Sequence, residues 1–273
     1  MTRYSLLPII ALMIIFSSIM ANAQKLPNVQ QASLRAPENV KVDGKPTEWG
    51  DKLQAYNKAT DVFYTIANDD NNLYLVIQAT DPSIINKLVN GRVTFTINKS
   101  GKKNDNDAIA ISYPVFEKNN KPGLHLTGNP KIVEGSPASI KLADSFMYAN
   151  NKRMTDRIKS IKVTGVKTLD TLVSIYNEDG IKAAALFDNK LVYTCELAVS
   201  LKLAGLSVND PVKFTYNVML NPVIMDDIPG FTIVRNAQGT ITSLDINNKL
   251  IPPNARELTA ATDFWGEYML AKK

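Results

Sequence analysis

Residues 42–49 read VDGKPTEW, and this stretch sets the expectation for the fold. The pair Asp43-Gly44 is a turn signal, because both residue types favour the backbone conformations of tight turns. Trp49 is a large apolar side chain that needs cover, so we expect it to fill the core at the start of a folded domain. From residue 40 onward, short apolar runs alternate with turn-forming residues. A compact β domain therefore begins here.

Alternation of apolar and polar residues predicts short strands along most of the chain. Two alternating runs, 61–67 and 73–79, flank a cluster of Asn and Asp and indicate an antiparallel hairpin. Residues 182–187 and 191–199 indicate a second hairpin. Many short strands with few helical patterns predict an all-β fold, an antiparallel β-sandwich with short helices. The remaining elements are a short helix at 82–90 and strands at 92–98, 108–113, 161–166, 172–176, 212–220 and 264–270.

Residues 114–160 form one long, irregular insertion. Its second part, 140–157, is consistent with a helix or with a long loop. Long insertions in compact domains are often functional or mobile, and the alternative is a plain surface excursion. We expect a single domain over residues 40–273, preceded by an extended, polar leader at 24–39.

The first 23 residues have the three parts of a cleavable signal peptide. Arg3 supplies a positive charge, residues 6–20 are almost wholly apolar, and residues 21–23 read Ala-Asn-Ala. The alternative is a retained membrane anchor, but the apolar run is near the lower limit for spanning a bilayer. We expect cleavage before Gln24 and no membrane span afterwards. The mature chain would then be exported, to a periplasm or to the cell exterior.

Charge and nucleophile content exclude several classes of function. The net charge is +5, but the lysines are scattered, which indicates a solvated surface rather than nucleic-acid binding. Cys195 is the only cysteine, so no internal disulfide can form. It lies in an apolar strand pattern, and we expect it to be buried rather than nucleophilic. His125 is the only histidine, which excludes sites built from several histidines within one chain.

Side chains with carboxylate, amide or hydroxyl oxygens are concentrated at several turns, but they do not indicate an active site. The carboxylate pairs Asp69-Asp70, Glu178-Asp179 and Asp226-Asp227 lie beside turn residues, where acidic residues are expected in any case. We therefore expect no catalysis. Residues 98–107 are rich in the ligand types that calcium prefers, but they lack the spacing of an EF-hand, and an ordinary hairpin loop has the same composition. We expect no cofactor and no metal, with calcium at this turn as the open alternative.

Residues 42–49 resemble the V-D-G-x-x-x-E-W opening of family 9 carbohydrate-binding modules and their DOMON-like relatives in exported bacterial proteins. Asp43, Gly44, Glu48 and Trp49 carry this match. Further similarities follow in the family's order at residues 72–75, 95–102, 193–206 and 264–267. Asn98 and Ser200 stand where the family has an acid and a proline. The resemblance spans most of residues 40–270, and it implies a β-sandwich, no catalysis and a carbohydrate ligand.

Sugar binding in such modules rests on an aromatic ring stacked on a pyranose, with amides and acids on its hydroxyls. Phe264 and Trp265 point to opposite faces of one strand, and Phe264 fits the core by resemblance. Trp265 is therefore the best candidate for an exposed platform, with a half-buried tryptophan as the alternative. The other candidate binding residues are Tyr148 in the insertion and the loop residues Asn221, Asp226 and Asp227.

Three functions remain open from the sequence. The leading one is an exported, non-catalytic binding domain whose partner is a polysaccharide or oligosaccharide. The second is a structural or protein-interaction protein of the envelope that kept the sandwich without a sugar site, as the scarcity of aromatic residues suggests. The third is a hydrolase with two carboxyl groups facing each other across a cleft.

Overall fold

The computed structural model describes residues 25–50, 53–103, 106–117, 120–124, 130, 132–133, 135–224, 231–246, 249–250 and 258–273. The predicted signal peptide, His125, Asp226 and Asp227 lie outside these residues. No helix within the described part of the chain is long and apolar enough to cross a membrane.

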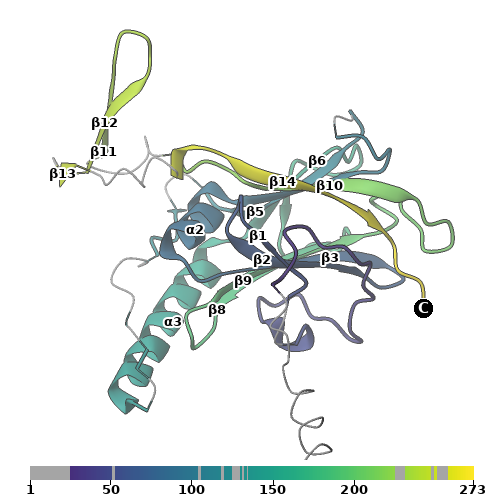
Figure 1. Ribbon diagram of the computed structural model, residues 1–273, viewed down its shortest axis with the longest axis horizontal. Coiled ribbons are helices and arrows are strands. Elements are labelled where there is room, and N and C mark those ends of the chain that lie inside the picture. The colour runs from purple at the N-terminus through teal and green to yellow at the C-terminus, as the bar shows by residue number, and fades with distance from the viewer. Residues whose placement is uncertain are drawn as a thin grey trace, which may run out of the picture.

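Two antiparallel sheets form the body of the molecule (Figure 1). The five-stranded sheet has the order β1-β2-β3-β9-β8, and the six-stranded sheet has the order β14-β10-β4-β5-β6-β7. The strands of the first sheet are β1 (Ala55–Asn57), β2 (Val62–Asn68), β3 (Asn72–Ala79), β8 (Ile181–Phe187) and β9 (Tyr193–Ser200). The strands of the second are β4 (Val93–Asn98), β5 (Ile109–Val115), β6 (Ser160–Thr164), β7 (Leu172–Ser174), β10 (Lys213–Leu220) and β14 (Thr262–Met269).

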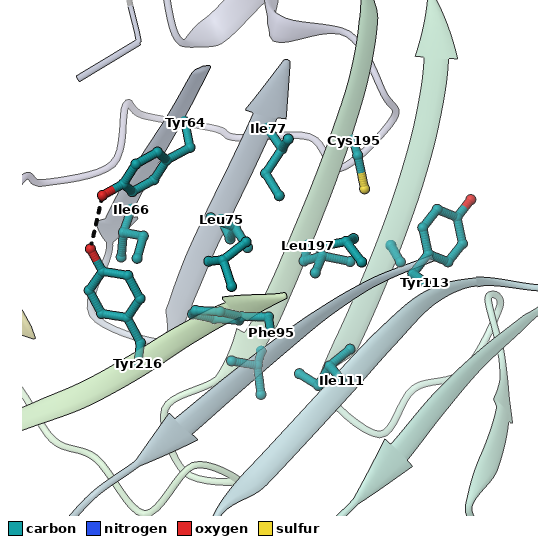
Figure 2. Close-up of a cluster of buried hydrophobic side chains, with 14 of the residues drawn as sticks. Tyr64, Ile66, Leu75, Ile77, Phe95, Ile111, Tyr113, Cys195, Leu197 and Tyr216 are labelled. Carbon is teal, nitrogen blue, oxygen red and sulfur yellow. Dashed lines mark hydrogen bonds between the residues drawn. The ribbon is translucent and has the colours of Figure 1, made fainter. Parts of the chain in front are cut away.

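The apolar faces of the two sheets share one core. Tyr64 on β2 and Tyr216 on β10 meet between the sheets, with their hydroxyl oxygens 3.2 Å apart (Figure 2). The Tyr64 ring also lies 4.7 Å from the ring of Phe264 on β14. Cys195 is buried in the same core, as predicted. Strand alternation thus places one face of each sheet inside and leaves the other face of each sheet outside.

Most predicted elements are confirmed within a residue or two. The pairing of β2 with β3 and of β8 with β9 confirms both predicted hairpins. Helix α2 (Pro82–Asn86) and the π-helical turn Lys87–Gly91 occupy the segment predicted as a short helix at 82–90. A 3-10 turn, η2, spans Pro46–Glu48.

The insertion contains the one long helix of the described chain, α3 (Pro137–Arg157). Its 21 residues settle the alternative between helix and loop in favour of the helix, which begins three residues earlier than the predicted range 140–157. Ser136 caps the helix through a hydrogen bond from Ser139 N to its Oγ. The helix lies beside β8, and Asn151 fixes it there by bonding the backbone N–H and C=O of Phe187.

A small third sheet was not predicted. It consists of β11 (Phe231–Arg235), β12 (Ile241–Ile246) and β13 (Lys249–Leu250), in that order. In Figure 1 the β11–β12 hairpin lies away from the two larger sheets. Apolar and polar residues alternate in the runs 231–235 and 241–246, which flank the turn-forming residues 236–239. This pattern indicates a hairpin and could have predicted β11 and β12.

The leader closes an open edge of the sandwich. Beyond the short strand β1, the edge of β2 is paired by the Gln30 side chain, whose Nε2 donates to Ile66 O and whose Oε1 accepts from Ile66 N, both at 2.8 Å. Leu34 O then accepts from Asn68 N at 3.0 Å. On the other sheet, the Tyr268 hydroxyl on β14 donates to Leu34 O at 2.9 Å. The leader is therefore part of the fold and joins both sheets.

Replacing Gln30 by alanine should lower the free energy of unfolding by roughly 2 kcal/mol, because it leaves the buried backbone N–H and C=O of Ile66 without partners. The matched control is Gln31→Ala, since Gln31 is exposed and bonds only Val29 O. That change should stay within about 0.5 kcal/mol. Urea denaturation of the purified variants measures both values. Equal effects of the two changes would refute the role given to Gln30.

Candidate functional site

Residues 42–49 fold over the outer face of the five-stranded sheet and bind one buried carboxylate, Glu196 on β9. Glu196 Oε2 accepts hydrogen bonds from Gly44 N at 2.8 Å and from Asp43 N at 3.0 Å. Glu196 Oε1 accepts from Trp49 Nε1 at 2.9 Å. Glu196 is only 2% exposed, so these three N–H donors supply the hydrogen bonds that water would give to an exposed carboxylate. Two motifs far apart in the sequence thus form one structural cluster.

Only glycine fits at position 44 of this cluster. Gly44 has a φ of +82°, and a Cβ there would lie 2.8 Å from the carbonyl carbon of Ala185 and the backbone nitrogen of Leu186. Glu48 takes no part in the binding of Glu196 and instead accepts a hydrogen bond from Thr47 Oγ1 at 2.9 Å.

Trp49 does not fill the core between the sheets, which corrects the expectation from the sequence. It is half-buried and covers the outer face of the five-stranded sheet. Its ring meets Tyr74 edge-on, with the ring centres 5.8 Å apart. The indole N–H needs a polar partner, and Glu196 supplies it only on this outer face.

Burial raises the pKa of Glu196 from its ordinary value of 4.5 to about 7, against the opposing effect of its three N–H donors. A carboxyl group with a raised pKa binds its proton more tightly in the folded state. Its contribution to stability is therefore fully present below about pH 4.5 and is lost as the pH rises through about 7.

A second cluster lies on the outer face of the six-stranded sheet, at β14. Phe264 is 6% exposed and points into the core, whereas the neighbouring Trp265 is half-buried on the outer face. Trp265 borders a hollow of about 690 Å³, called here the Trp265 hollow. The hollow is lined by amides, hydroxyls and charged groups, together with three apolar side chains: Thr96, Asn98, Ser100, Lys102, Lys103, Asn106, Asp107, Asn217, and the apolar Ala108, Met219 and Trp265.

Strand pairing and side-chain amides shape this hollow. Asn217 on β10 stands directly opposite both Trp265 on β14 and Thr96 on β4. Its Nδ2 donates to Asp263 Oδ2 at 2.6 Å and to Phe264 O at 3.0 Å. Two residues beyond Thr96 on β4, Asn98 Nδ2 donates to the carbonyl oxygens of Lys102 and Lys103, at 2.7 and 2.9 Å. These bonds fasten the turn after β4 beside the tryptophan.

One face of the Trp265 ring has a cation over it. The ammonium nitrogen of Lys103 lies 5.8 Å from the ring centre. This cation–π contact contributes about 0.5–1 kcal/mol at an exposed site. A ligand that stacks on this face has to move Lys103 aside or interact with it.

The other predicted site residues have different surroundings. Asn221 lies on the same outer face as Trp265, but its Nδ2 is engaged by Arg92 O at 3.0 Å and Thr94 Oγ1 at 2.8 Å. Tyr148 is 70% exposed on α3 and does not border the hollow. The structure therefore brings Trp265 and Asn221 onto one face and leaves Tyr148 elsewhere.

Sequence reasoning missed Asn217, Thr96 and Lys103 as candidate binding residues. Part of this site could have been predicted from the sequence. Apolar and polar residues alternate in 212–220 and 92–98, so the polar side chains of both strands must face outward. What the sequence does not give is the order of the strands, which sets β10 between β4 and β14.

The carboxylates of the Asp69-Asp70 pair have structural partners. Asp69 accepts hydrogen bonds from Asn71 N, Asn72 N and the Tyr74 hydroxyl, and Asp70 pairs with Arg35 and Lys273. Among the described residues, no group of three or more His, Cys, Asp or Glu could hold a metal ion. Burial raises the pKa of the Cys195 thiol far above its usual range, so the sulfur stays protonated and inert.

Comparisons of the chain with protein families and with curated proteins found no match. The candidate site therefore has to be interpreted from its own residues.

Replacing Glu196 by glutamine removes the titrating group from the cluster. We expect the stability difference, native chain minus Glu196→Gln, to fall by roughly 3 kcal/mol between about pH 4.5 and about pH 8. Calorimetric melting of both proteins across this range measures the difference. A difference that instead grows with pH would mean that the three N–H donors outweigh burial and keep the pKa low.

Replacing Gly44 by alanine should lower the free energy of unfolding by more than about 3 kcal/mol, since both the left-handed backbone and the close approach to β8 oppose a side chain. Gly50→Ala is the matched control, because Gly50 has a φ of +70° but a Cβ added there would have nothing within 4 Å. It should lose only about 1–2 kcal/mol, the cost of the backbone conformation alone. Chemical denaturation separates the two contributions, and similar losses would contradict the packing argument.

Proposed function

We propose that this protein is an exported, non-catalytic domain that binds a glycan in the Trp265 hollow. The observation that carries the proposal is a half-buried tryptophan on the outer sheet face, at the side of a hollow of about 690 Å³. Clefts of about 300–1,000 Å³ are the usual size for small-ligand sites.

The residue types around the hollow suit a sugar. An aromatic ring covers the apolar C–H face of a pyranose, which water solvates poorly. Amide and hydroxyl groups exchange hydrogen bonds with the sugar hydroxyls around that ring. Thr96 lies on the same row of directly paired residues as Trp265, with the buried Asn217 between them, so a hydroxyl group is available near the ring.

The resemblance to family 9 carbohydrate-binding modules supports the same proposal. The matched residues Asp43, Gly44 and Trp49 are those that meet Glu196, which lies in another matched segment. Because this cluster joins the matched segments in space, we propose a β-sandwich of the family 9 kind. The signal-like residues 1–23 support export, to a periplasm or to the cell exterior.

A single tryptophan would serve as the platform. Trp49 is the only other tryptophan, and it lies on the opposite sheet with its N–H bound to Glu196. A ligand in the hollow should therefore change the fluorescence of Trp265 and leave that of Trp49 unchanged. This gives a direct reading of binding.

Trp265→Ala should weaken binding to a glycan found by screening soluble and insoluble polysaccharides by at least about tenfold, because the stacking surface is lost. Tyr176→Ala is the matched control. Tyr176 is an exposed aromatic that, like Trp265, has a lysine over its ring, Lys159 at 5.7 Å, and it lies outside the hollow. It should bind as the native chain does. Circular dichroism and Trp49 fluorescence verify that the Trp265 variant is folded.

Absence of any glycan binding, or equal binding by the native chain and Trp265→Ala, would refute the proposal. The structural or protein-interaction function would then be favoured, and a stable protein partner should co-purify with the chain.

A further inference from the structure

A second hollow adjoins the Trp265 hollow on the same outer sheet face. It has a volume of about 410 Å³ and is called here the Lys162 hollow. Its floor is polar: Thr94 Oγ1 and Ser112 Oγ lie 2.8 Å apart, and Asn221 Nδ2 donates to Thr94 Oγ1. Its lining consists of Asn90, Gly91, Arg92, Thr94, Ala110, Ser112, Lys162, Thr164, Asn221, Pro222 and Ile224.

The strand register joins the two hollows into one continuous row. Trp265 is opposite Asn217, Asn217 opposite Thr96, Thr96 opposite Ala110, and Ala110 opposite Thr164. The first three line the Trp265 hollow and the last two line the Lys162 hollow. Neighbouring strands lie about 4.8 Å apart, so this row crosses the sheet over roughly 19 Å. The fourth side chain, Ala110, which lies where the two hollows meet, is small and does not block the row.

Basic residues outnumber acidic ones in the lining of the two hollows beside the row. The described lining of the two hollows includes the basic residues Arg92, Lys102, Lys103 and Lys162, and one carboxylate, Asp107. Asp263 beside Trp265 already accepts a hydrogen bond from Asn217. The whole chain carries only a small net charge, so this balance is a local property of the outer face.

The position of Lys103 also favours a negatively charged ligand. A neutral sugar that stacks on the covered face of Trp265 has to displace the ammonium group from the ring. An acidic sugar attracts the same ammonium to its own carboxylate or sulfate, so the lost cation–π contact is replaced by a charge-assisted hydrogen bond.

We infer that the ligand is an anionic polysaccharide whose chain crosses the strands from Trp265 to Lys162. This inference rests on the proposed function of the Trp265 hollow and specifies its ligand. Trp265 stacks one sugar ring. Thr96 binds a hydroxyl of the chain as it crosses β4, and Lys162 with Arg92 binds an acidic group at the far end.

The test is calorimetric titration of the purified chain with oligogalacturonates of increasing length, and with neutral oligosaccharides of the same lengths. Affinity for the acidic series should rise with length until the row is filled, exceed that for the neutral series, and decrease with added salt. Lys162→Gln should weaken binding of the long acidic oligomers roughly tenfold and leave binding of the monosaccharide unchanged. Trp265→Ala should weaken both.

Lys182→Gln is the matched control, because Lys182 is an exposed strand lysine on the outer face of the other sheet. It should have no effect on any ligand. Sulfated oligosaccharides form a second arm, which distinguishes carboxylate from sulfate as the acidic group.

Three outcomes would overturn the inference. If Trp265→Ala abolishes binding but length, acidity and Lys162→Gln have no effect, the site takes a short neutral sugar, and the proposed function stands alone. If neutral oligomers bind as tightly as acidic ones, the role of charge is wrong. If polyphosphate binds as tightly as the sugars and Trp265→Ala has no effect, surface charge alone explains the binding, and the proposed function fails as well.

Discussion

The buried carboxylate of Glu196 is the interaction on which much of this fold depends. An unpaired carboxylate in the interior is very costly, so its burial requires three N–H donors at once. Those donors come from the segment that contains Asp43, Gly44 and Trp49, which is thereby held against β9. Because β9 lies between β3 and the edge strand β8, this one contact covers the outer face of the five-stranded sheet toward its β8 edge. The other sheet keeps its outer face open.

The fold was predictable where local patterns are strong. Alternation and turn residues located both hairpins, β2–β3 and β8–β9, because register and turn chemistry there are encoded by adjacent residues. Strand β1 escaped prediction because three residues are too few to show a period. Helix α3 was ambiguous because its sequence is polar on most sides and buries only Ala143, Asn150 and Met154, so it lacks a clear apolar stripe.

The candidate site was predictable only in part. The outward direction of Trp265 follows from the buried position of its neighbour Phe264 and the alternation of a strand. The residues around it come from β4, β10 and the turn after β4, and their meeting depends on strand order, which no local pattern records. For Trp49 the prediction was wrong, because bulk alone suggested the core, whereas its N–H needed the carboxylate on the outer face.

The leader has a consequence for the order in which the chain can fold. Ser33 Oγ donates to Met269 O, and Leu34 exchanges hydrogen bonds with the Tyr268 hydroxyl, so the beginning of the described chain meets its last strand. These contacts close a loop that takes in nearly the whole domain, and forming it is entropically costly. The sandwich can therefore be completed only after β14 has been made. Until then Ser33 and Leu34 lack their partners on β14, and the incomplete sandwich remains open to unfolding and to capture by other factors.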